Sequence, residues 1–584
     1  MKFTADFETC TWLPDETYVW AWACCNIEDE KINIGNSMET FFEFIKSFHN
    51  PTFYFHNLKF DGEFIIYHLL KNGYEWVNDK SKRSKTFTTL INQMGQFYTI
   101  TIYEEIKNKH TKKITFIDSL KILPFSVSLI AKSFKLPISK LEIDYNEPRE
   151  IGHILTKEEE EYIKNDVLIV AKALKVLFDE GLEKMTQASN ALFDYKKLLN
   201  EKRFKRLFPK LTFEIDADIR KSYKGGFTYL NPIYKEKDVK EGYVLDVNSL
   251  YPSVMYNEAL PFGEPYFYEG KYKEDKVYPL YIQMITCSFE LKENKIPTIQ
   301  IKNSMSFKGN EYLTSSNNEI VTLVLTNVDL DLFLEHYNVY DLNYLKGWKF
   351  KSLKGVIFKD YIDKWIKVKN ESTLSGNFGM RTLAKLMLNA LYGKFATTLK
   401  VQSKMPYLED DVVKYKVLPE EQKDGIYIPI GAFITSYARN KTIRTSQAIK
   451  EYSIKNYGKD LYCYSDTDSI HTLLDVEELK KFCEIDDVEL GKWKVEGHFI
   501  KAKFVRQKTY LEEFINKEGK KEINITCAGL PERCYPYVKW KEFKEGFKCG
   551  GKLIFSHIKG GVKLIETDFT IKSDKPLLKS VKKF

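Results

Sequence analysis

Long apolar runs are missing from this sequence. No stretch of 18 apolar residues occurs, so we expect no helix that crosses a membrane. Residues 1–8 include two acids and no apolar core, and we therefore expect no secretory signal peptide. Fixed-period repeats and low-complexity blocks are absent as well. These absences argue against a membrane-spanning, secreted or repeat protein.

Cysteine offers little chemistry in a chain of this size. Nine cysteines occur among 584 residues, and none form a CxxC pair. No cluster of cysteine and histidine has the spacing of zinc ligands. We therefore expect no zinc site and a reduced, cytosolic setting.

An excess of one charge is almost absent. Lys and Arg number 89 and Asp and Glu 81, which gives a net charge of +8. This balance permits a polyanionic partner without requiring one. Aromatic residues make up 15% of the chain, and some of them could stack on bases, although core packing explains most of them. At roughly 150 residues per domain, the length allows about four domains.

The pattern of apolar and polar residues divides the chain into segments. We expect strands at 2–13 and from 242 onward, a hairpin at 86–104, and a helix over 156–185 that begins with a capping box. Beyond these, we expect a strand-rich segment at about 260–358, a helix at 381–395, a polar, mixed segment at about 398–425, and strands at 428–439 and 461–474. We interpret the basic segment 196–208 as a linker and 572–584 as a basic tail.

Four acids in the first third of the chain suggest a metal site. Asp6 and Glu8 are two apart in an expected strand, so both side chains lie on one face. Asp61 follows in HNLKFDGEF, and Asp166 lies four residues after Tyr162 on one face of the expected helix. Acids that converge repel each other unless cations intervene. Two Mg²⁺ ions about 3.5–4 Å apart would relieve the repulsion and clamp the attacking water and the leaving oxygen of a phosphodiester.

Each of these acids alone has a simpler explanation as a solvated surface residue. Asp6 fits that explanation least, because it stands among Phe3, Ala5 and Phe7 in an otherwise apolar strand. The hypothesis of a metal site therefore depends on the four acids meeting in space.

A second group of acids lies in the C-terminal half. Asp246 ends the apolar strand YVLD, and Asp466 and Asp468 are two apart in YSDTDS. Acids at strand ends suit Mg²⁺, which prefers a few carboxylates together with substrate phosphates. Phosphoryl transfer needs positioning and charge neutralisation, and two ions could activate a primer 3′-hydroxyl and hold a triphosphate. A DxD pair alone is more often a turn.

The expected helix at 381–395 carries a cationic stripe. Arg381, Lys385, Asn389 and Tyr392 follow one another at spacings of four, four and three, so they share one face. A cationic stripe that ends in an aromatic ring suits a triphosphate with a base stacked beyond it. Without the acids, an ordinary amphipathic helix with a wet basic face would explain the pattern better.

Seven short motifs resemble, in order, those of family B DNA polymerases. They are DFET at 6–9, HNLKFD at 56–61, Tyr162 with Asp166, DVNSLYP at 246–252, KLMLNALYG at 385–393, YSDTDS at 464–469 and Lys508-Thr509-Tyr510. The first three resemble the exonuclease motifs, the next three polymerase motifs A, B and C, and the last the KxY motif. The matches extend over nearly the whole chain.

Within family B, the chain resembles the protein-primed polymerases of the phi-29 group of phages. YKGG at 223–226 is similar to that group's linker between the exonuclease and polymerase domains. The segments at about 260–356 and 398–426 stand where the group carries two terminal-protein-region insertions, and the first includes TNVDL at 326–330. The short overall length is also typical of that group.

The resemblance implies a role for each matching residue. Asp6, Glu8, Asp61 and Asp166 would bind the exonuclease metals, with Tyr162 orienting the attacking water and Lys140 stabilising charge on the scissile phosphate. Frayed primer would be held by Thr9, His56, Asn57, Phe60, Ser119 and Leu120. Asp246 and Asp468 would be the main polymerase metal ligands, with Asp466 beside them. Tyr251 would exclude a 2′-hydroxyl, and the nucleotide would be bound by Lys385, Asn389 and Tyr392. Lys508 and Tyr510 would steady the primer end, and other DNA contacts would come from Tyr223, Gly225, Gly226, Thr435 and Arg439.

The implied fold is multidomain, α/β and α+β: a ribonuclease-H-like exonuclease domain followed by a right-hand polymerase with two insertions. The expected boundaries are 1–186 for the exonuclease domain, 187–259 and 427–528 for the two parts of the palm, 260–356 and 398–426 for the insertions, 357–397 for the fingers, and 529–584 for the thumb and tail. The stretch 370–380 before motif B is longer than the family pattern, and the basic tail is extra.

The implied function is a DNA-directed DNA polymerase with a 3′→5′ proofreading exonuclease, which replicates a linear viral genome from a protein primer, processively and with strand displacement. Its cofactor would be Mg²⁺, or Mn²⁺ in its place, with two ions per active site. Its partners would be primer–template DNA, dNTPs and a phage terminal protein bound as a heterodimer. The polymerase itself would be monomeric, in the cytoplasm of a bacterial host and without a membrane partner. A conventionally primed family B polymerase and a metal-dependent nuclease are the alternatives.

Overall fold

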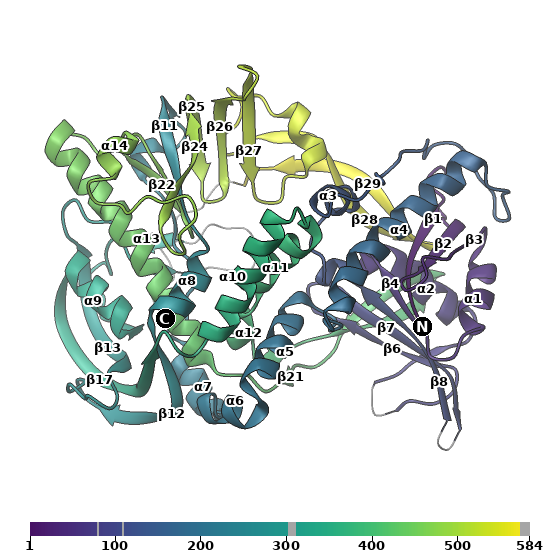
Figure 1. The fold of residues 1–584 in the computed structure, drawn as a ribbon, viewed down its shortest axis with the longest axis horizontal. Helices are drawn as coiled ribbons and strands as arrows, with labels where there is room; N and C mark the ends of the chain where they lie inside the picture. The colour runs from purple at the N-terminus through teal and green to yellow at the C-terminus, as the bar shows by residue number, and fades with distance from the viewer. Residues whose placement is uncertain (79–80, 108–109, 302–310, 573–584) are drawn as a thin grey trace.

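The computed structural model describes residues 1–78, 81–107, 110–301 and 311–572 (Figure 1). An N-terminal lobe is built around an eight-stranded sheet, and a larger lobe contains a five-stranded central sheet and most of the smaller sheets. One hydrophobic cluster joins the lobes, because it runs from Trp20 and Ile163 to Tyr361 and Ile434. Among the described residues, no helix is long and apolar enough to cross a bilayer.

The N-terminal lobe is a mixed sheet with helices on both faces. Its strand order is β3-β2-β1-β4-β8-β7-β6-β5. The strands are β1 Lys2–Thr9, β2 Val19–Asn26, β3 Ile32–Gly35, β4 Thr52–Phe55, β5 Glu75–Trp76, β6 Thr86–Ile91, β7 Phe97–Lys107 and β8 His110–Asp118. Helices α1 (Met38–Lys46) and α2 (Leu58–Lys71) cover one face, and α4 (Lys157–Asp179) covers the other. The strand predicted at 2–13 is found over Lys2–Thr9 as β1, and the hairpin predicted at 86–104 is confirmed as β6 with β7.

Alternation along β1 decides which side chains face α4. Phe3 and Phe7 belong to the cluster on the side of α1 and α2, whereas Thr4 donates to the backbone oxygen of Val167 on α4 at 2.7 Å. Because side chains alternate along a strand, Asp6 also faces α4. Asp6 and Glu8 therefore lie under this helix.

Helix α4 begins with the predicted capping box. Thr156 accepts a hydrogen bond from the Glu159 amide at 3.2 Å, and the Thr156 amide donates to Glu159 Oε2 at 2.9 Å. The helix ends at Asp179, earlier than predicted, because Gly181 soon follows with a φ of 74°.

Five antiparallel strands form the central sheet of the larger lobe, in the order β24-β11-β23-β22-β9. They are β9 Thr228–Leu230, β11 Gly242–Val247, β22 Tyr462–Asp466, β23 Ser469–Thr472 and β24 Trp493–Phe499. The predicted strands from 242 onward and within 461–474 are confirmed. Helices α8 (Leu250–Asn257) and α13 (Ile428–Tyr457) pack beside this sheet.

The strand predicted at 428–439 is wrong, because these residues form the first turns of the 30-residue helix α13. Pro429 stands in its first turn, and Gly458 ends it in the left-handed conformation. Residues 428–436 are buried all round. A short apolar run buried on every side has the same sequence pattern in a helix as in a strand.

The strand-rich segment predicted at 260–358 is confirmed. It forms a four-stranded sheet in the order β12-β17-β13-β16. Its main elements are β12 Ala259–Glu269, β13 Leu280–Leu291, β16 Val321–Thr326, α9 Asn327–His336 and β17 Tyr337–Lys354.

Several helices lie between the two lobes. They are α3 Val127–Ser133, α5 Gln187–Leu199, α6 Glu201–Leu207, α7 Phe213–Arg220, α10 Lys359–Leu374, α11 Phe378–Ala390 and α12 Tyr392–Phe395. The single helix predicted at 381–395 is interrupted at Leu391. Most of the segment interpreted as a linker, 196–208, is helical and belongs to α5 and α6, and Phe204 and Phe208 pack with Tyr195 in the core.

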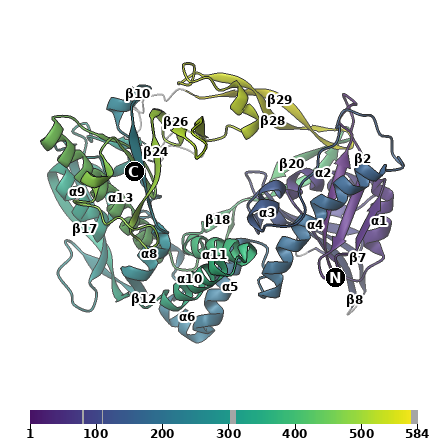
Figure 2. The same ribbon diagram turned by 45° about the horizontal axis from the view of Figure 1, so that its top comes forward.

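The polar segment at 398–425 contains the hairpin of β19 (Lys404–Glu409) and β20 (Val412–Val417). A smaller sheet, β10-β25-β26-β27, follows the central one, with the bounds Asp238–Val239, Lys501–Arg506, Thr509–Ile515 and Lys521–Cys527. The last hairpin, β28 (Lys548–Ile558) with β29 (Gly561–Thr570), spans from the larger lobe to the N-terminal lobe (Figure 2). The predicted tail lies outside the described residues from 573 onward.

Three distant parts of the chain meet at one buried carboxylate, Glu63 on α2, which we call the Glu63 junction. Glu63 is 2% exposed. Tyr415 on β20 donates to its Oε2 at 2.7 Å, and His557 on β28 lies 3.1 Å from its Oε1. The N-terminal lobe is therefore tied to both hairpins at this point.

Candidate active sites

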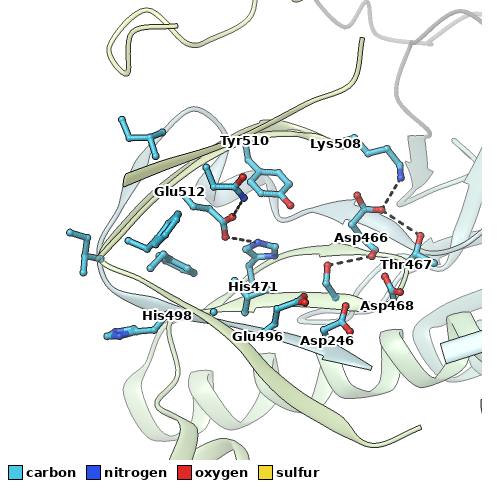
Figure 3. A pocket seen from close by; sticks show the side chains of 18 of the residues that line it. Asp246, Asp466, Thr467, Asp468, His471, Glu496, His498, Lys508, Tyr510 and Glu512 are labelled. Atoms are coloured by element: carbon cyan, nitrogen blue, oxygen red, sulfur yellow. Dashed lines mark hydrogen bonds and ion pairs between the residues drawn. The ribbon is translucent and has the colours of Figure 1, made fainter. Parts of the chain in front are cut away.

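The predicted acids of the C-terminal half meet at one edge of the central sheet. Asp246 pairs with Ser469 across β11 and β23, and Asp466 pairs with the same serine across β22 and β23. The Val247 amide donates to the Asp468 backbone oxygen at 2.8 Å, which keeps motif A beside motif C. All three acids line a cavity of about 1130 Å³, and Figure 3 shows Asp246 and Asp468 next to one another.

The linker motif YKGG supports the turn between Asp466 and Asp468. Thr467 has a φ of 61°, and its amide donates to the Phe227 backbone oxygen at 2.7 Å. A Cβ on Gly226 would stand 2.7 Å from Thr467 Oγ1, so a side chain cannot enter there without moving the turn. The linker and the DTD turn therefore position each other.

These acids carry negative charge that the protein only partly compensates. Burial raises the pKa of Asp246 to about 7, and the charges of Asp468 and Glu496 add to the effect. Burial also raises the pKa of Asp468. Glu496 was not predicted; it lies on β24, two residues after Lys494, which pairs with Asp246. Period-two alternation could have revealed it once the pairing of β24 with β11 was known.

The two residues predicted to steady the primer end lie on the opposite wall of the same cavity. Lys508 Nζ is 3.1 Å from Asp466 Oδ1, and the Lys508 amide donates to the Tyr464 hydroxyl at 2.8 Å. Tyr510 lies against Tyr464, with ring centroids 5.3 Å apart. The KxY motif is thus placed directly beside motif C.

A buried polar network that the sequence did not predict supports this wall. His471 Nε2 lies 2.9 Å from Glu512 Oε1, and Asn524 donates to Glu512 Oε2 at 3.0 Å. Burial alone would raise the pKa of Glu512, but the hydrogen bond to His471 and the charge on that ring lower it overall. The His471 ring meets Tyr510 edge-on at 5.1 Å (Figure 3).

Two of the predicted nucleotide-binding residues, Tyr251 and Tyr392, line this cavity. The rings of Tyr251 on α8 and Tyr392 on α12 stack with centroids 4.1 Å apart. Lys385 and Asn389 share the exposed face of α11. Burial lowers the pKa of Lys385, and the nearby positive charges of Arg381 and Lys369 lower it further. Lys369 on α10 was not predicted from the sequence.

The predicted acids of the N-terminal lobe also meet. Lys140 Nζ is 2.8 Å from Asp166 Oδ2, and Asp61 Oδ1 accepts from the Phe7 amide at 3.2 Å. A small cavity of about 100 Å³ is lined by Asp6, Lys140 and Asp166 together with His56. The pKa of Asp6 is raised to about 7, because burial and the negative charge of Asp166 together outweigh the positive charge of Lys140.

The two other acids, Glu8 and Asp61, are buried beside Asp6. Burial raises the pKa of each, and the charge of Asp6 contributes in both cases. Tyr162 is 3% exposed, and its hydroxyl lies 2.6 Å from that of Tyr145. Tyr145 was missed, because nothing in its local sequence distinguishes it.

The acids of both sites fit a divalent cation by their chemistry. In the described part of the chain, no group of three or more His, Cys, Asp or Glu side chains is already arranged to hold a metal ion. The donors are nevertheless hard carboxylate oxygens, which suit Mg²⁺ or Mn²⁺. Asp166 Oδ1 is buried without a hydrogen-bond partner, as expected of an oxygen whose ligand is a cation.

Of the residues predicted to hold frayed primer, His56 lines the N-terminal cavity. Thr9 ends β1, and Asn57 precedes α2 with a φ of 85°. Phe60 and Leu120 are partly exposed. Ser119 is fully buried in this structure and hydrogen bonds to His56 Nδ1 and to the Phe55 backbone oxygen, and its contact with primer stays a prediction.

Thr435 and Arg439, which were also predicted to contact DNA, are 1% and 3% exposed in this structure, and their DNA contact stays a prediction. Thr435 bonds to backbone oxygens within α13. Arg439 pairs with Asp329 Oδ2 at 2.5 Å and donates to the Gly225 backbone oxygen at 2.8 Å. Arg439 therefore holds the linker in place, while Tyr223 and Gly225 remain partly or fully exposed.

Comparisons with known proteins agree on one family. A family model described as DNA polymerase type B, organellar and viral, matches residues 47–482. The chain is 46% identical to a DNA polymerase of Bacillus phage M2, over 98% of this chain and 99% of that protein. It is 33% identical to the DNA polymerase of Streptococcus phage Cp-1, over 98% of both.

Solved structures show the same relationship. Phi29 DNA polymerase complexed with primer-template DNA and incoming nucleotide substrates aligns with a TM-score of 0.90 at 43% identity, over 98% of this chain and 100% of that one. This likeness confirms the expected fold of a multidomain protein with exonuclease, palm, fingers and thumb domains. The chain therefore belongs to the organellar and viral type B DNA polymerases, and its relatives include those of phi29-like phages.

Proposed function

We propose that this type B DNA polymerase extends primers at the acids of its central sheet and removes 3′-terminal nucleotides at the acids of its N-terminal lobe. The observation that carries the proposal is the presence of two separate groups of partly or fully buried carboxylates, one in each lobe. A nuclease alone would not explain why Asp246, Asp466 and Asp468 line one cavity.

In the polymerase site, Asp246 and Asp468 would hold two divalent ions, with Asp466 beside them. Bound ions would neutralise phosphate charge and activate the primer hydroxyl. Lys508, next to Asp466, and Tyr510, in the same cavity, would hold the primer end. Precise placement of this kind supplies much of the rate in phosphoryl transfer.

The nucleotide would enter between α11 and the stacked pair of Tyr251 and Tyr392. Lys385 would pair with its phosphates, and Asn389 lies on the same exposed face. Tyr251 is held by Tyr392, so its ring cannot easily move aside for a 2′-hydroxyl. This arrangement supports selection of deoxynucleotides.

In the exonuclease site, Asp6, Glu8, Asp61 and Asp166 would hold the ions. Tyr162, with its hydroxyl fixed by Tyr145, would orient the attacking water. When a metal binds Asp166, the ammonium of Lys140 would turn from Asp166 toward the scissile phosphate. The single-stranded primer would lie along a further set of residues: Thr9, His56, Asn57, Phe60 and Leu120.

A variant with Asp468→Ala tests the separation of the two sites. It should lose primer extension and keep degradation of single-stranded DNA, because the N-terminal acids lie on another sheet. The matched variant Asp166→Ala should lose degradation and keep extension. Loss of both activities in either variant would contradict two independent sites.

We further propose that synthesis begins on a terminal protein and proceeds with strand displacement. The resemblance to the phi-29 group supports this, through the insertions at 260–356 and 398–426. We assign the remaining ranges as expected: exonuclease domain 1–186, palm 187–259 and 427–528, fingers 357–397, and thumb with tail 529–584. A conventionally primed polymerase would ignore a terminal protein. Incubation with Mg²⁺, dNTPs and a candidate terminal protein should therefore yield a covalent protein–dNMP product.

A further inference from the structure

The central sheet contributes a cation to the nucleotide site that the stripe on α11 did not reveal. Lys494 on β24 lies directly opposite Asp246 on β11. Residues directly opposite each other on antiparallel strands project from the same face, so Lys494 and Asp246 face the same space. Lys494 Nζ is 3.8 Å from Asp246 Oδ1 and 3.3 Å from Glu496 Oε1. Its side chain is 32% exposed, which leaves the ammonium accessible to a ligand.

Three more cations lie on the helices near Lys494. Lys369 lies on α10, and Arg381 and Lys385 lie on α11. Burial and the positive charge of Arg381 lower the pKa values of Lys369 and Lys385, and the positive charge of Lys494 lowers both further. Within the described residues, none of these three helix cations has a carboxylate partner. Four like charges gathered in this way indicate a binding site for a polyanion.

Lys494 differs from the other three because it already has anionic partners. The following step depends on the proposed function, in which Asp246 binds a divalent ion. An ion on Asp246 would repel the ammonium of Lys494, because like charges a few ångströms apart interact unfavourably even in water. The four-carbon stem of lysine lets the charge move while the strand stays fixed. The incoming triphosphate is the anion that arrives at the same time.

We propose that Lys494 is a fourth phosphate-binding cation of the nucleotide site, which pairs with Asp246 in the free enzyme and with the triphosphate of the incoming nucleotide in the loaded one. It approaches the phosphates from the sheet, whereas Lys369, Arg381 and Lys385 approach them from the helices. The triphosphate is thereby enclosed between positive charges on two sides.

Single-nucleotide incorporation on a primed template tests this role. Lys494→Met keeps the stem and removes the charge, and Lys494→Arg keeps the charge. Loss of one charge-assisted phosphate contact should raise the KM for dNTP about ten-fold in K494M, with kcat within about two-fold of wild type. K494R should hold KM within about three-fold of the wild-type value.

A second probe isolates the phosphate contact from base pairing. Inorganic tripolyphosphate lacks a base and a sugar, and its inhibition constant should rise in K494M by about the same factor as KM. Lys492→Met is the matched control, because Lys492 pairs with Glu489 at 2.7 Å instead of with the acids of the site. This control should leave both constants unchanged.

Several results would overturn the role of Lys494. They are a KM and an inhibition constant within two-fold of wild type in K494M, an equal rise in K492M, or a loss of activity in both K494M and K494R. Wild-type enzyme assayed with EDTA tests the proposed metal sites separately. Synthesis without divalent ions would refute those sites, while the comparison of KM values would still decide the role of Lys494.

Discussion

The Glu63 junction should make the contact between the N-terminal lobe and the β28–β29 hairpin dependent on pH. The hydrogen bond to Glu63 raises the pKa of His557 above its ordinary 6.5, against burial and the charges of Lys59 and Lys404. A histidine whose pKa is raised on folding contributes stability that is fully present below its unfolded pKa. That contribution is lost as the pH rises through the folded-state pKa. The contact should therefore be tighter at pH 6 than at pH 8.5.

Replacement of His557 by Gln measures this contribution, because glutamine keeps a donor and lacks the charge. A hydrogen bond to a charged group contributes about 1.5–3 kcal/mol. His557 is 35% exposed, so solvent screening reduces the expected loss to about 1 kcal/mol. That free energy corresponds to a roughly five-fold higher equilibrium constant for local opening of the hairpin.

Hydrogen exchange of the β28–β29 amides, followed by mass spectrometry, is the appropriate assay. The ratio of H557Q to wild-type exchange rates at each pH cancels the intrinsic effect of pH on exchange. We expect a ratio of about five at pH 6 that falls toward one by pH 8.5. A ratio that is the same at both pH values, or equal to one throughout, would refute the reasoning. Amides of β2, far from the junction, serve as the internal reference.

Other substitutions give further expected outcomes. Tyr145→Phe removes the hydroxyl 2.6 Å from Tyr162, so degradation of single-stranded DNA should slow about ten-fold while primer extension is unchanged. Asp329→Asn breaks a buried ion pair with an arginine that is 3% exposed, which should destabilise the protein by about 3–5 kcal/mol and lower its denaturant midpoint. Gly226→Ala places a Cβ 2.7 Å from Thr467 Oγ1, so the turn must shift; extension should slow about ten-fold, and unchanged kinetics would show that the turn has room.

Local signals in the sequence identified much of the candidate chemistry. Each of these signals lies within a few residues of sequence and follows from the spacing of a helix or a strand. They are the capping box at Thr156, the acids of β1 and the DTD turn. The same periodicity misassigned 428–439, since a segment buried on all sides has no polar face to mark its period.

Contacts between distant segments could not be predicted in this way. Lys494 and Glu496 join the site only because β24 pairs with β11, and no local pattern specifies that pairing. Buried partners are similarly hidden. Arg439 has the positive charge expected of a DNA contact, and no local pattern shows that Asp329 and backbone oxygens of the linker surround its side chain.

The Glu63 junction also has a consequence for how the protein is made. Glu63 and Tyr415 are separated by 352 positions along the chain, and Glu63 and His557 by 494. At about 5–20 residues per second, a ribosome needs about 25–100 seconds to deliver the last of these partners. During that time the nascent N-terminal lobe presents an uncovered surface, including Phe64, against which Gly561 of the last hairpin finally packs. Premature termination before β28 would leave that surface open, so truncated products should be marked for aggregation or proteolysis even though their first sheet is complete.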